Sequence, residues 1–145
     1  MMSRSVLGIL CVALGLPLLG GCWGGPGVDM VPVRGTVKFT DGTVPQGEVA
    51  TITFDPVAGG SSPVRKVASG QIKPDGGFEL STVKPGDGAI VGKYKVTIEV
   101  YKNYIAGRGD LQIPEKYTKT ETTPFEVTVE SGMKPCEFVL DKPGA

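Results

Sequence analysis

The sequence predicts an all-β protein, an antiparallel two-sheet sandwich of about seven strands. Three observations lead to this prediction. Apolar and polar residues alternate with a period of two in several short segments, as they do in strands that bury one face. Turn-forming residues separate these segments, with 22 glycines and 12 prolines in 145 residues. No segment carries an apolar stripe at helical spacing, so we expect almost no helix.

The expected strands follow one another at short intervals. In most of them apolar and polar residues alternate, and in chain order they cover residues 31–39, 50–55, 64–72, 78–80, 93–100, 125–129 and 136–140. The run at 93–100 alternates most strongly, and its inward side holds Tyr94, Val96, Ile98 and Val100. The run at 64–72 is more polar, which is typical of a strand at the edge of a sheet.

Glycine-containing turns connect these strands. Residues that preset a turn stand beside glycines that accept positive φ at Asp41-Gly42, Lys73-Pro74-Asp75-Gly76, Pro85-Gly86-Asp87-Gly88 and Ser131-Gly132. The inward positions hold enough Val, Ile, Phe and Leu for one core, and Cys136 falls among them. A buried free cysteine packs as a small hydrophobe. We expect this structural role for Cys136 in preference to a redox or intermolecular one.

The segment 101–124 is the longest stretch without a period, so we expect a loop there. Loops longer than about 12 residues are often functional. Tyr101, Tyr104, Arg108 and Tyr117 lie in or beside this segment, where aromatic rings can stack on sugars or fill a partner's pocket. The competing interpretation is that some rings pack against the sandwich and hold the loop to it. For Tyr117 we favour this packing role.

The N-terminal segment has the form of a bacterial export signal. Arg4 supplies a positive start, and the apolar run at 6–19 is shorter than the roughly 20 residues that span a bilayer. The run ends in Leu19-Gly20-Gly21-Cys22, which resembles the lipobox of bacterial lipoproteins. That resemblance implies cleavage after Gly21 and a lipid on Cys22. The alternative is a plain secretory signal with an incidental cysteine.

The predicted organisation is a signal peptide at 1–21, a lipidated cysteine with a flexible tether at 22–30, and a sandwich domain at 31–142. Several acyl chains on Cys22 would hold the protein firmly, since each buried methylene contributes about 0.8 kcal/mol. Trp23 is the single tryptophan, and it is either an anchor at headgroup level or a linker residue. It stands where an aspartate retains some lipoproteins at the inner membrane, so we expect a cell-envelope protein at the outer membrane.

Composition excludes several classes of function. The mature chain has 145 − 21 = 124 residues, and without Arg4 its net charge is 14 − 15 = −1, which does not suit nucleic acid. The sequence contains no histidine, so a histidine-activated nucleophile and an imidazole metal site are excluded. Of the three cysteines, Cys11 leaves with the signal and Cys22 carries lipid. Cys136 then has no partner for a disulfide within the domain.

Three aspartates that adjoin glycines are the remaining candidates for a metal site. Oxygen-rich loops can bind Ca²⁺, and Asp75, Asp87 and Asp110 lie in such segments. Asp-Gly is also ordinary in β-turns, and no Asp-x-Asp-x-Asp ladder is present. We therefore expect neither a metal nor a cofactor.

Four short segments together are similar to a known kind of domain. They are Val33-Arg34-Gly35-Thr36-Val37, Phe54-Asp55-Pro56, Asp75-Gly76-Gly77-Phe78-Glu79-Leu80 and Gly92-Lys93-Tyr94-Lys95-Val96-Thr97-Ile98. They resemble carboxypeptidase regulatory-like and transthyretin-like domains, and residues 113–117 with the closing strands are similar to small lipoproteins of planctomycete-type bacteria. The resemblance implies a transthyretin-like sandwich and an accessory, non-catalytic module. Transthyretin-like enzymes that hydrolyse hydroxyisourate depend on histidines, so no catalytic residue is carried over.

These observations lead to one expected function and one alternative. We expect a non-catalytic, lipid-anchored module of the cell envelope with a structural or protein-interaction role. The alternative is a module that binds carbohydrate or another ligand through the segment Tyr101–Tyr117. The expected partners are the membrane, through the lipid anchor, and an envelope protein or a polysaccharide. The carboxylates are scattered and offer no pair for acid–base catalysis, so we do not expect an enzyme.

Overall fold

The computed structural model describes residues 27–59 and 64–144. Within them the elements are β1 (Met30–Val31), β2 (Arg34–Phe39), β3 (Val49–Pro56), β4 (Ala68–Gln71), β5 (Gly77–Glu79), β6 (Ala89–Ile90), β7 (Gly92–Ile105), β8 (Arg108–Leu111), the 3₁₀ helix η1 (Glu115–Thr118), β9 (Glu126–Val129) and β10 (Cys136–Leu140). The all-β prediction is confirmed. None of the described residues forms a helix long and apolar enough to span a bilayer. The predicted signal peptide, its cleavage site and Cys22 lie outside the described residues.

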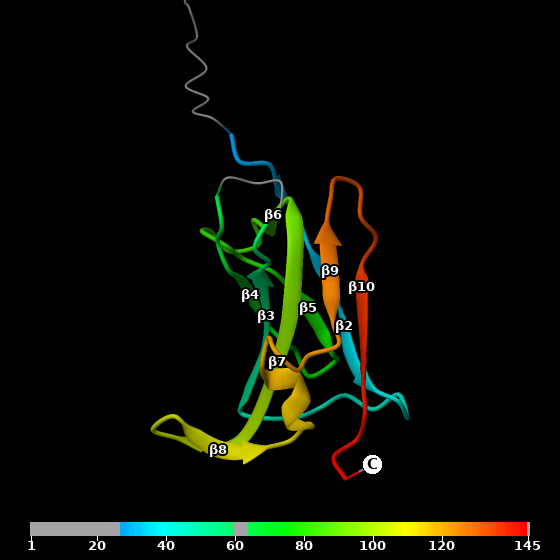
Figure 1. Cartoon of the computed structure of the whole chain (residues 1–145). Helices are drawn as coiled ribbons and strands as arrows, with labels where there is room; N and C mark the ends of the chain where they lie inside the picture. The colour runs from blue at the N-terminus through cyan, green and yellow to red at the C-terminus, as the bar shows by residue number, and fades with distance from the viewer. Residues whose placement is uncertain (1–26, 60–63, 145) are drawn as a thin grey trace, which may run out of the picture.

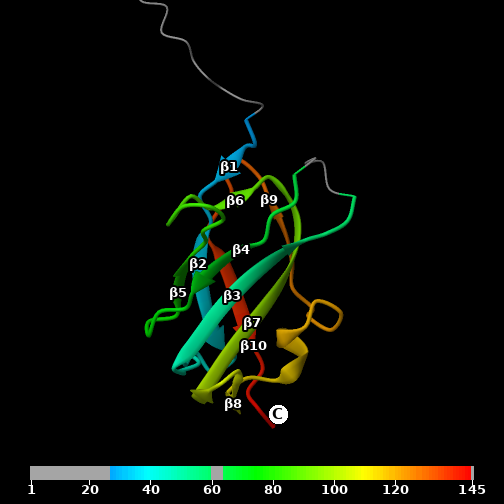
Figure 2. The same ribbon diagram turned by 90° about the vertical axis from the view of Figure 1, so that its left-hand side faces the viewer.

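Two sheets face each other (Figures 1 and 2). The larger has the order β4-β3-β7-β8, and β9 also pairs with β7, on the side away from β3. The smaller has the order β10-β2-β5. The short strands β1 and β6 pair at the end of the sandwich where the chain enters (Figure 1). The predicted sandwich is therefore confirmed.

The pairing of β10 with β2 is parallel, although every other strand pair in the described residues is antiparallel. After β9 the chain crosses to the smaller sheet, so β10 does not pair with its neighbour in sequence. Cys136 then stands opposite Gly35. A Cβ at Gly35 would lie 2.1 Å from the carbonyl oxygen of Cys136 and 2.9 Å from Cε1 of Phe78. Only glycine allows the strands to approach this closely.

The core lies between the sheets and follows the alternation in the sequence. Tyr94, Val96, Ile98 and Val100 on β7 are each at most 2% exposed. Phe138 on β10 joins the two layers, because its ring centroid lies 6.1 Å from that of Phe54 on β3, 6.0 Å from that of Phe78 on β5 and 5.1 Å from that of Phe125. Burial of these apolar side chains on both sheets is the main stabilising term for the fold.

Two expected strands are shorter than the alternation suggests. The run at 31–39 divides into β1 and β2, separated by Pro32, which has no N–H to donate to a ladder. The run at 64–72 forms a strand only from Ala68 to Gln71, and β4 lies at the edge of the larger sheet as expected.

The predicted loop at 101–124 is wrong in its first half. β7 continues to Ile105, and β8 returns from Arg108, so a β-hairpin extends beyond the sandwich (Figure 1). Ala106 and Gly107 have φ values of 49° and 80° and form the two-residue turn, since both central residues of a type I′ turn need positive φ. Residues 102–105 are all exposed, so no buried face marks this strand in the sequence.

Candidate functional site

The β7–β8 hairpin carries three of the four residues predicted for recognition. Tyr101 and Tyr104 lie on β7 and Arg108 lies on β8, so they occupy paired strands and not a flexible loop. The rings of Tyr101 and Tyr104 are neighbours, with centroids 5.4 Å apart and planes inclined at 45°. Partial burial raises the pKa of Tyr101, and the Glu99 carboxylate raises it further, so its hydroxyl stays protonated at neutral pH.

Polar contacts fix the shape of the hairpin. The Oε2 atom of Glu48 accepts a hydrogen bond of 3.0 Å from the backbone N–H of Tyr104. Across the hairpin, Nδ2 of Asn103 donates to Oδ2 of Asp110 over 2.7 Å. Asn103 has a positive φ of 49°, and it lies where the register between β7 and β8 shifts, between Lys102 and Ile105. These contacts hold the tip in one conformation, which lowers the entropy lost when a partner binds.

The tip of the hairpin exposes apolar surface. Ile105 is 76% exposed, the largest value among the exposed large apolar residues of the described chain, and Tyr104 is 41% exposed. Lys102 and Arg108 are also exposed beside them. An aromatic ring, an aliphatic side chain and two cations at one projecting edge form the kind of surface that fits a groove on another molecule.

Tyr117 does not belong to this surface. It lies on η1, is 2% exposed and stacks on Phe125, with ring centroids 5.3 Å apart and planes at 12°. Its hydroxyl donates to Oδ2 of Asp141 and accepts from the backbone N–H of the same residue, each over 3.0 Å. The ring therefore fastens the segment after β8 to the sandwich, because packing against the core leaves it no accessible face.

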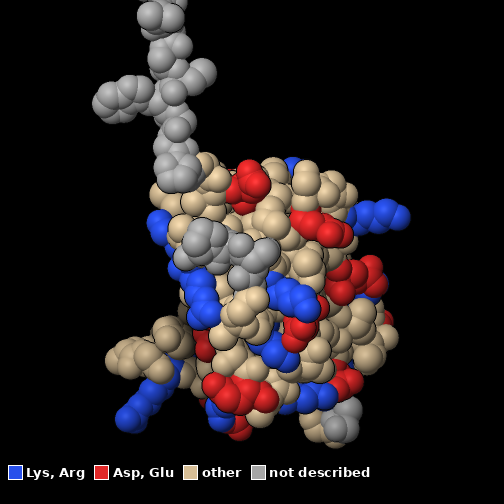
Figure 3. Space-filling model, turned by 45° about the horizontal axis from the view of Figure 1, so that its top comes forward, with Lys and Arg blue, Asp and Glu red and all other residues tan. Residues whose placement is uncertain are grey.

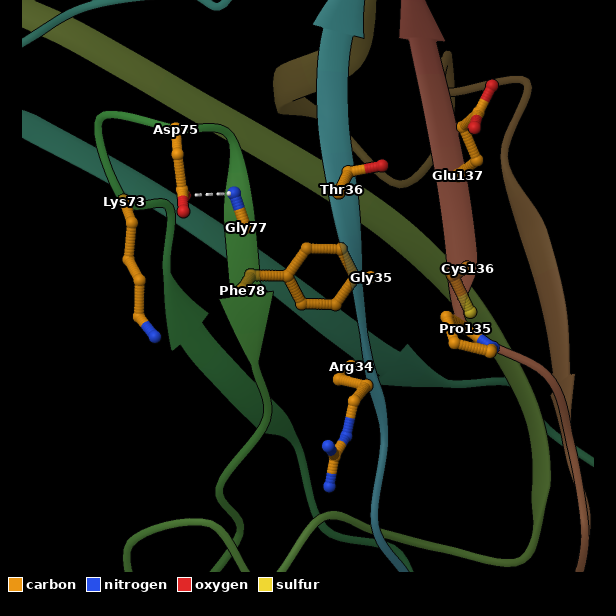
Figure 4. A pocket seen from close by; sticks show the side chains of 10 residues that line it. All are labelled: Arg34, Gly35, Thr36, Lys73, Asp75, Gly77, Phe78, Pro135, Cys136 and Glu137. Carbon is orange, nitrogen blue, oxygen red and sulfur yellow. Dashed lines mark hydrogen bonds between the residues drawn. The ribbon is translucent and has the colours of Figure 1, made fainter.

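Cys136 is half-buried and borders a shallow groove of about 360 Å³ on the smaller sheet (Figure 4). Figure 4 shows the ring of Phe78 lying across Gly35, with Lys73 and Arg34 pointing toward the same side. Partial burial raises the pKa of the Cys136 thiol, which disfavours the reactive thiolate at neutral pH. The cysteine is less buried than the alternation predicts because β10 begins at that residue, at the margin of the core.

The three aspartates considered for calcium lie apart and act in turns and pairs. Asp75 accepts from the backbone N–H of Gly77, and Asp87 accepts from three consecutive backbone N–H groups, those of residues 82–84. Asp110 pairs with Asn103. Among residues 27–59 and 64–144, no three His, Cys, Asp or Glu side chains gather as metal ligands would. These three aspartates therefore stabilise local turns and the hairpin.

Two residues that shape this site, one outside the hairpin and one at its tip, were not predicted from the sequence. The carboxylate of Glu48 accepts a hydrogen bond from the backbone N–H of Tyr104, which lies 56 positions later in the chain, and no local sequence pattern predicts such a contact. Ile105 is the most exposed large apolar residue of the described chain. The sequence signal for its position is Gly107, which follows a run of strand-forming residues and marks a tight turn.

Comparison of the chain with family models, with curated proteins and with solved structures found no match. The similarity to carboxypeptidase regulatory-like domains therefore stays an expectation from the sequence motifs.

Proposed function

We propose that the protein is a non-catalytic, lipid-anchored module of the cell envelope that presents the β7–β8 hairpin to a protein partner. In this proposal Cys22 carries the lipid and residues 22–30 connect it to the sandwich. The compartment and the anchor follow from the export signal and from Leu19-Gly20-Gly21-Cys22. The outer membrane is the proposed location.

One observation supports the proposal most. The chain enters the described domain at β1, at one end of the sandwich, and the β7–β8 hairpin projects from the opposite end (Figure 1). A module held by its N-terminus would therefore point the hairpin away from the membrane. Its exposed Ile105 and Tyr104 are then the first apolar groups that a partner meets.

The charge pattern agrees with a role in binding and not in chemistry. Five of the described carboxylates form ion pairs with lysines in which every side chain is more than one third exposed, such as Lys38–Glu137 and Lys95–Glu126. Exposed pairs of this kind are screened by water and are worth little. They keep the outer faces of the two sheets polar, whereas the hairpin tip exposes the apolar side chains of Ile105 and Tyr104.

The test of this function places a photo-crosslinking amino acid at Ile105 in the full-length protein in its native cells. A discrete protein adduct is expected at that position, and the same probe at Val139, which is 40% exposed on β10, serves as the matched control. Cells that carry Cys22→Ser report on the anchor, since the variant should lose acyl label and leave the detergent phase. Unlabelled wild type would refute the anchor. Equal adducts at both probe positions would refute the hairpin's role.

A second candidate function is carbohydrate binding, and the exposed Tyr104 ring is the observation that favours it. The ring lies beside that of Tyr101, and the same hairpin carries the amide–carboxylate pair of Asn103 and Asp110. Sugars are recognised by aromatic stacking together with polar groups of this kind. Titration with envelope polysaccharides should then show binding that Tyr104→Ala abolishes. Absence of binding by the wild type would exclude this function.

A further inference from the structure

A second apolar surface lies at the tether end of the domain. It is a groove of about 440 Å³ whose apolar lining comes mainly from Val28, Met30, Val83 and Ile90. Val83 is 66% exposed and Val28 is 37% exposed. The groove is formed by the segment that enters β1, by the segment before β4 and by the turn before β6. In Figure 1, β1 and β6 lie at the end of the domain where the chain enters.

Cations border this groove. Lys66 and Lys84 line it, and Arg65 is exposed next to Lys66. One carboxylate also lines the groove, that of Asp87, and hydrogen bonds from backbone N–H groups lower its pKa and keep it ionised, so the lining carries two cations and one anion. With the tether end turned forward, Lys and Arg side chains gather on the left of the upper surface, beside tan apolar and polar groups (Figure 3).

The length of the tether keeps this groove close to the lipid. Six residue steps separate Cys22 from Val28, and a fully extended chain of that length reaches about 21 Å at most. The intervening sequence holds Gly24, Gly25 and Gly27, and for a glycine-rich segment of this length the expected mean end-to-end distance is about 13 Å. The lipidated sulfur lies at the bilayer surface, so the groove would stay near the headgroups at all times.

We propose that the tether-end groove docks on a bilayer surface that carries anionic headgroups. This inference rests on the proposed lipid anchor at Cys22. Val28 and Val83 enter the apolar edge of the interface, and Lys66 and Lys84 pair with lipid phosphates. Because the anchor makes the contact intramolecular, its effective concentration is in the millimolar range, and a weak affinity is enough to populate it. Docking fixes the orientation of the domain and points the hairpin outward.

The test uses two full-length lipoproteins in which Trp23 is replaced, so that each has one tryptophan. The first carries Trp23→Phe with Val83→Trp, and the matched control carries Trp23→Phe with Ile105→Trp at the opposite end. Both are reconstituted in vesicles of phosphatidylcholine and phosphatidylglycerol that contain lipids brominated near the headgroup. Severalfold stronger quenching is expected for Val83→Trp than for Ile105→Trp.

Removal of charge tests the lysines. Adding Lys66→Gln and Lys84→Gln should weaken docking about 30-fold, because each lysine near an anionic surface favours contact roughly fivefold. Lys73→Gln with Lys102→Gln removes two cations away from the groove and should leave quenching unchanged.

The outcomes separate the two proposals. Protein that does not float with vesicles would refute the anchor, and the docking inference with it. Protein that floats without quenching of Val83→Trp would refute docking and leave the anchor intact. If the tryptophan introduced by Val83→Trp is protected from water but is not quenched by the brominated lipids, a protein or a second copy of the chain covers the groove. That result would overturn the inference. If Val83→Trp is quenched as strongly in vesicles of phosphatidylcholine alone as in vesicles that contain phosphatidylglycerol, Lys66 and Lys84 do not contribute to docking by pairing with anionic lipids.

Discussion

Asp41 is a single charged residue that connects two segments far apart in the chain. Its carboxylate accepts from the backbone N–H and the hydroxyl of Thr43, over 3.0 and 2.6 Å, and it pairs with Lys142 after β10. These contacts join the turn that follows β2 to the C-terminal segment. The hydrogen bond from Lys142 contributes most, followed by those from Thr43, and together they lower the pKa of Asp41 to about 2.

The lowered pKa predicts a loss of stability in acid. A carboxyl whose pKa is depressed by folding stabilises the native state fully above its unfolded value of about 3.9, and that contribution disappears as pH falls toward 2. Asp41→Asn should therefore flatten the decline in the urea midpoint between these pH values. Lys142→Ala should raise the pKa of Asp41 toward its ordinary value in an NMR titration. An unchanged titration would contradict the role given to Lys142.

At the scale of the element, Tyr117 links the segment after β8 to the sandwich. Tyr117 on η1 stacks on Phe125 and makes two hydrogen bonds with Asp141, and the Nζ atom of Lys116 lies 4.9 Å from the centre of the same ring. The residues around η1 have no regular strand pairing of their own. Tyr117 therefore acts together with the buried Ile113 and with Thr123, whose hydroxyl donates to the carbonyl oxygen of Val96 over 2.6 Å, in fixing their position.

Tyr117→Phe keeps the ring and removes the hydroxyl. Loss of two partly buried hydrogen bonds should lower the free energy of unfolding by about 1–3 kcal/mol. Urea unfolding monitors this loss, and amide exchange should quicken in residues 112–124. Tyr104→Phe is the matched control, because an exposed tyrosine at the hairpin should change stability by less than about 0.5 kcal/mol. Equal midpoints for both variants would argue against the fastening role of Tyr117.

The hairpin shows why one element escaped prediction. Alternation reveals a strand only where one face is buried, and β7 loses that pattern after Tyr101 because both faces of the hairpin are in water. The turn adds to the difficulty, since Ala106 occupies a position with positive φ where asparagine or glycine is usual. Backbone pairing with β8 and the distant carboxylate of Glu48 define this element, and neither is visible in a local pattern.

At the scale of the whole molecule, the two proposed binding surfaces lie at opposite ends of the domain. One end receives the tether and carries the groove with Lys66 and Lys84, and the other projects the β7–β8 hairpin (Figure 1). Between them Phe138 contacts aromatic rings from both sheets, so the two ends are fixed to one core. Because the domain is one packed unit, docking of the tether end on a membrane would also fix the direction in which the hairpin points.

The sequence by itself determined the strands that bury one face and most of the turns between them, because burial of one face imposes a period of two and tight turns demand particular residues. It also determined the chemistry that is excluded, since a chain without histidine lacks the commonest acid–base group and metal ligand. Only the tertiary structure decided the parallel pairing of β10 with β2, the hairpin and the packing of Tyr117. These depend on contacts between residues far apart in the chain, which local patterns do not encode.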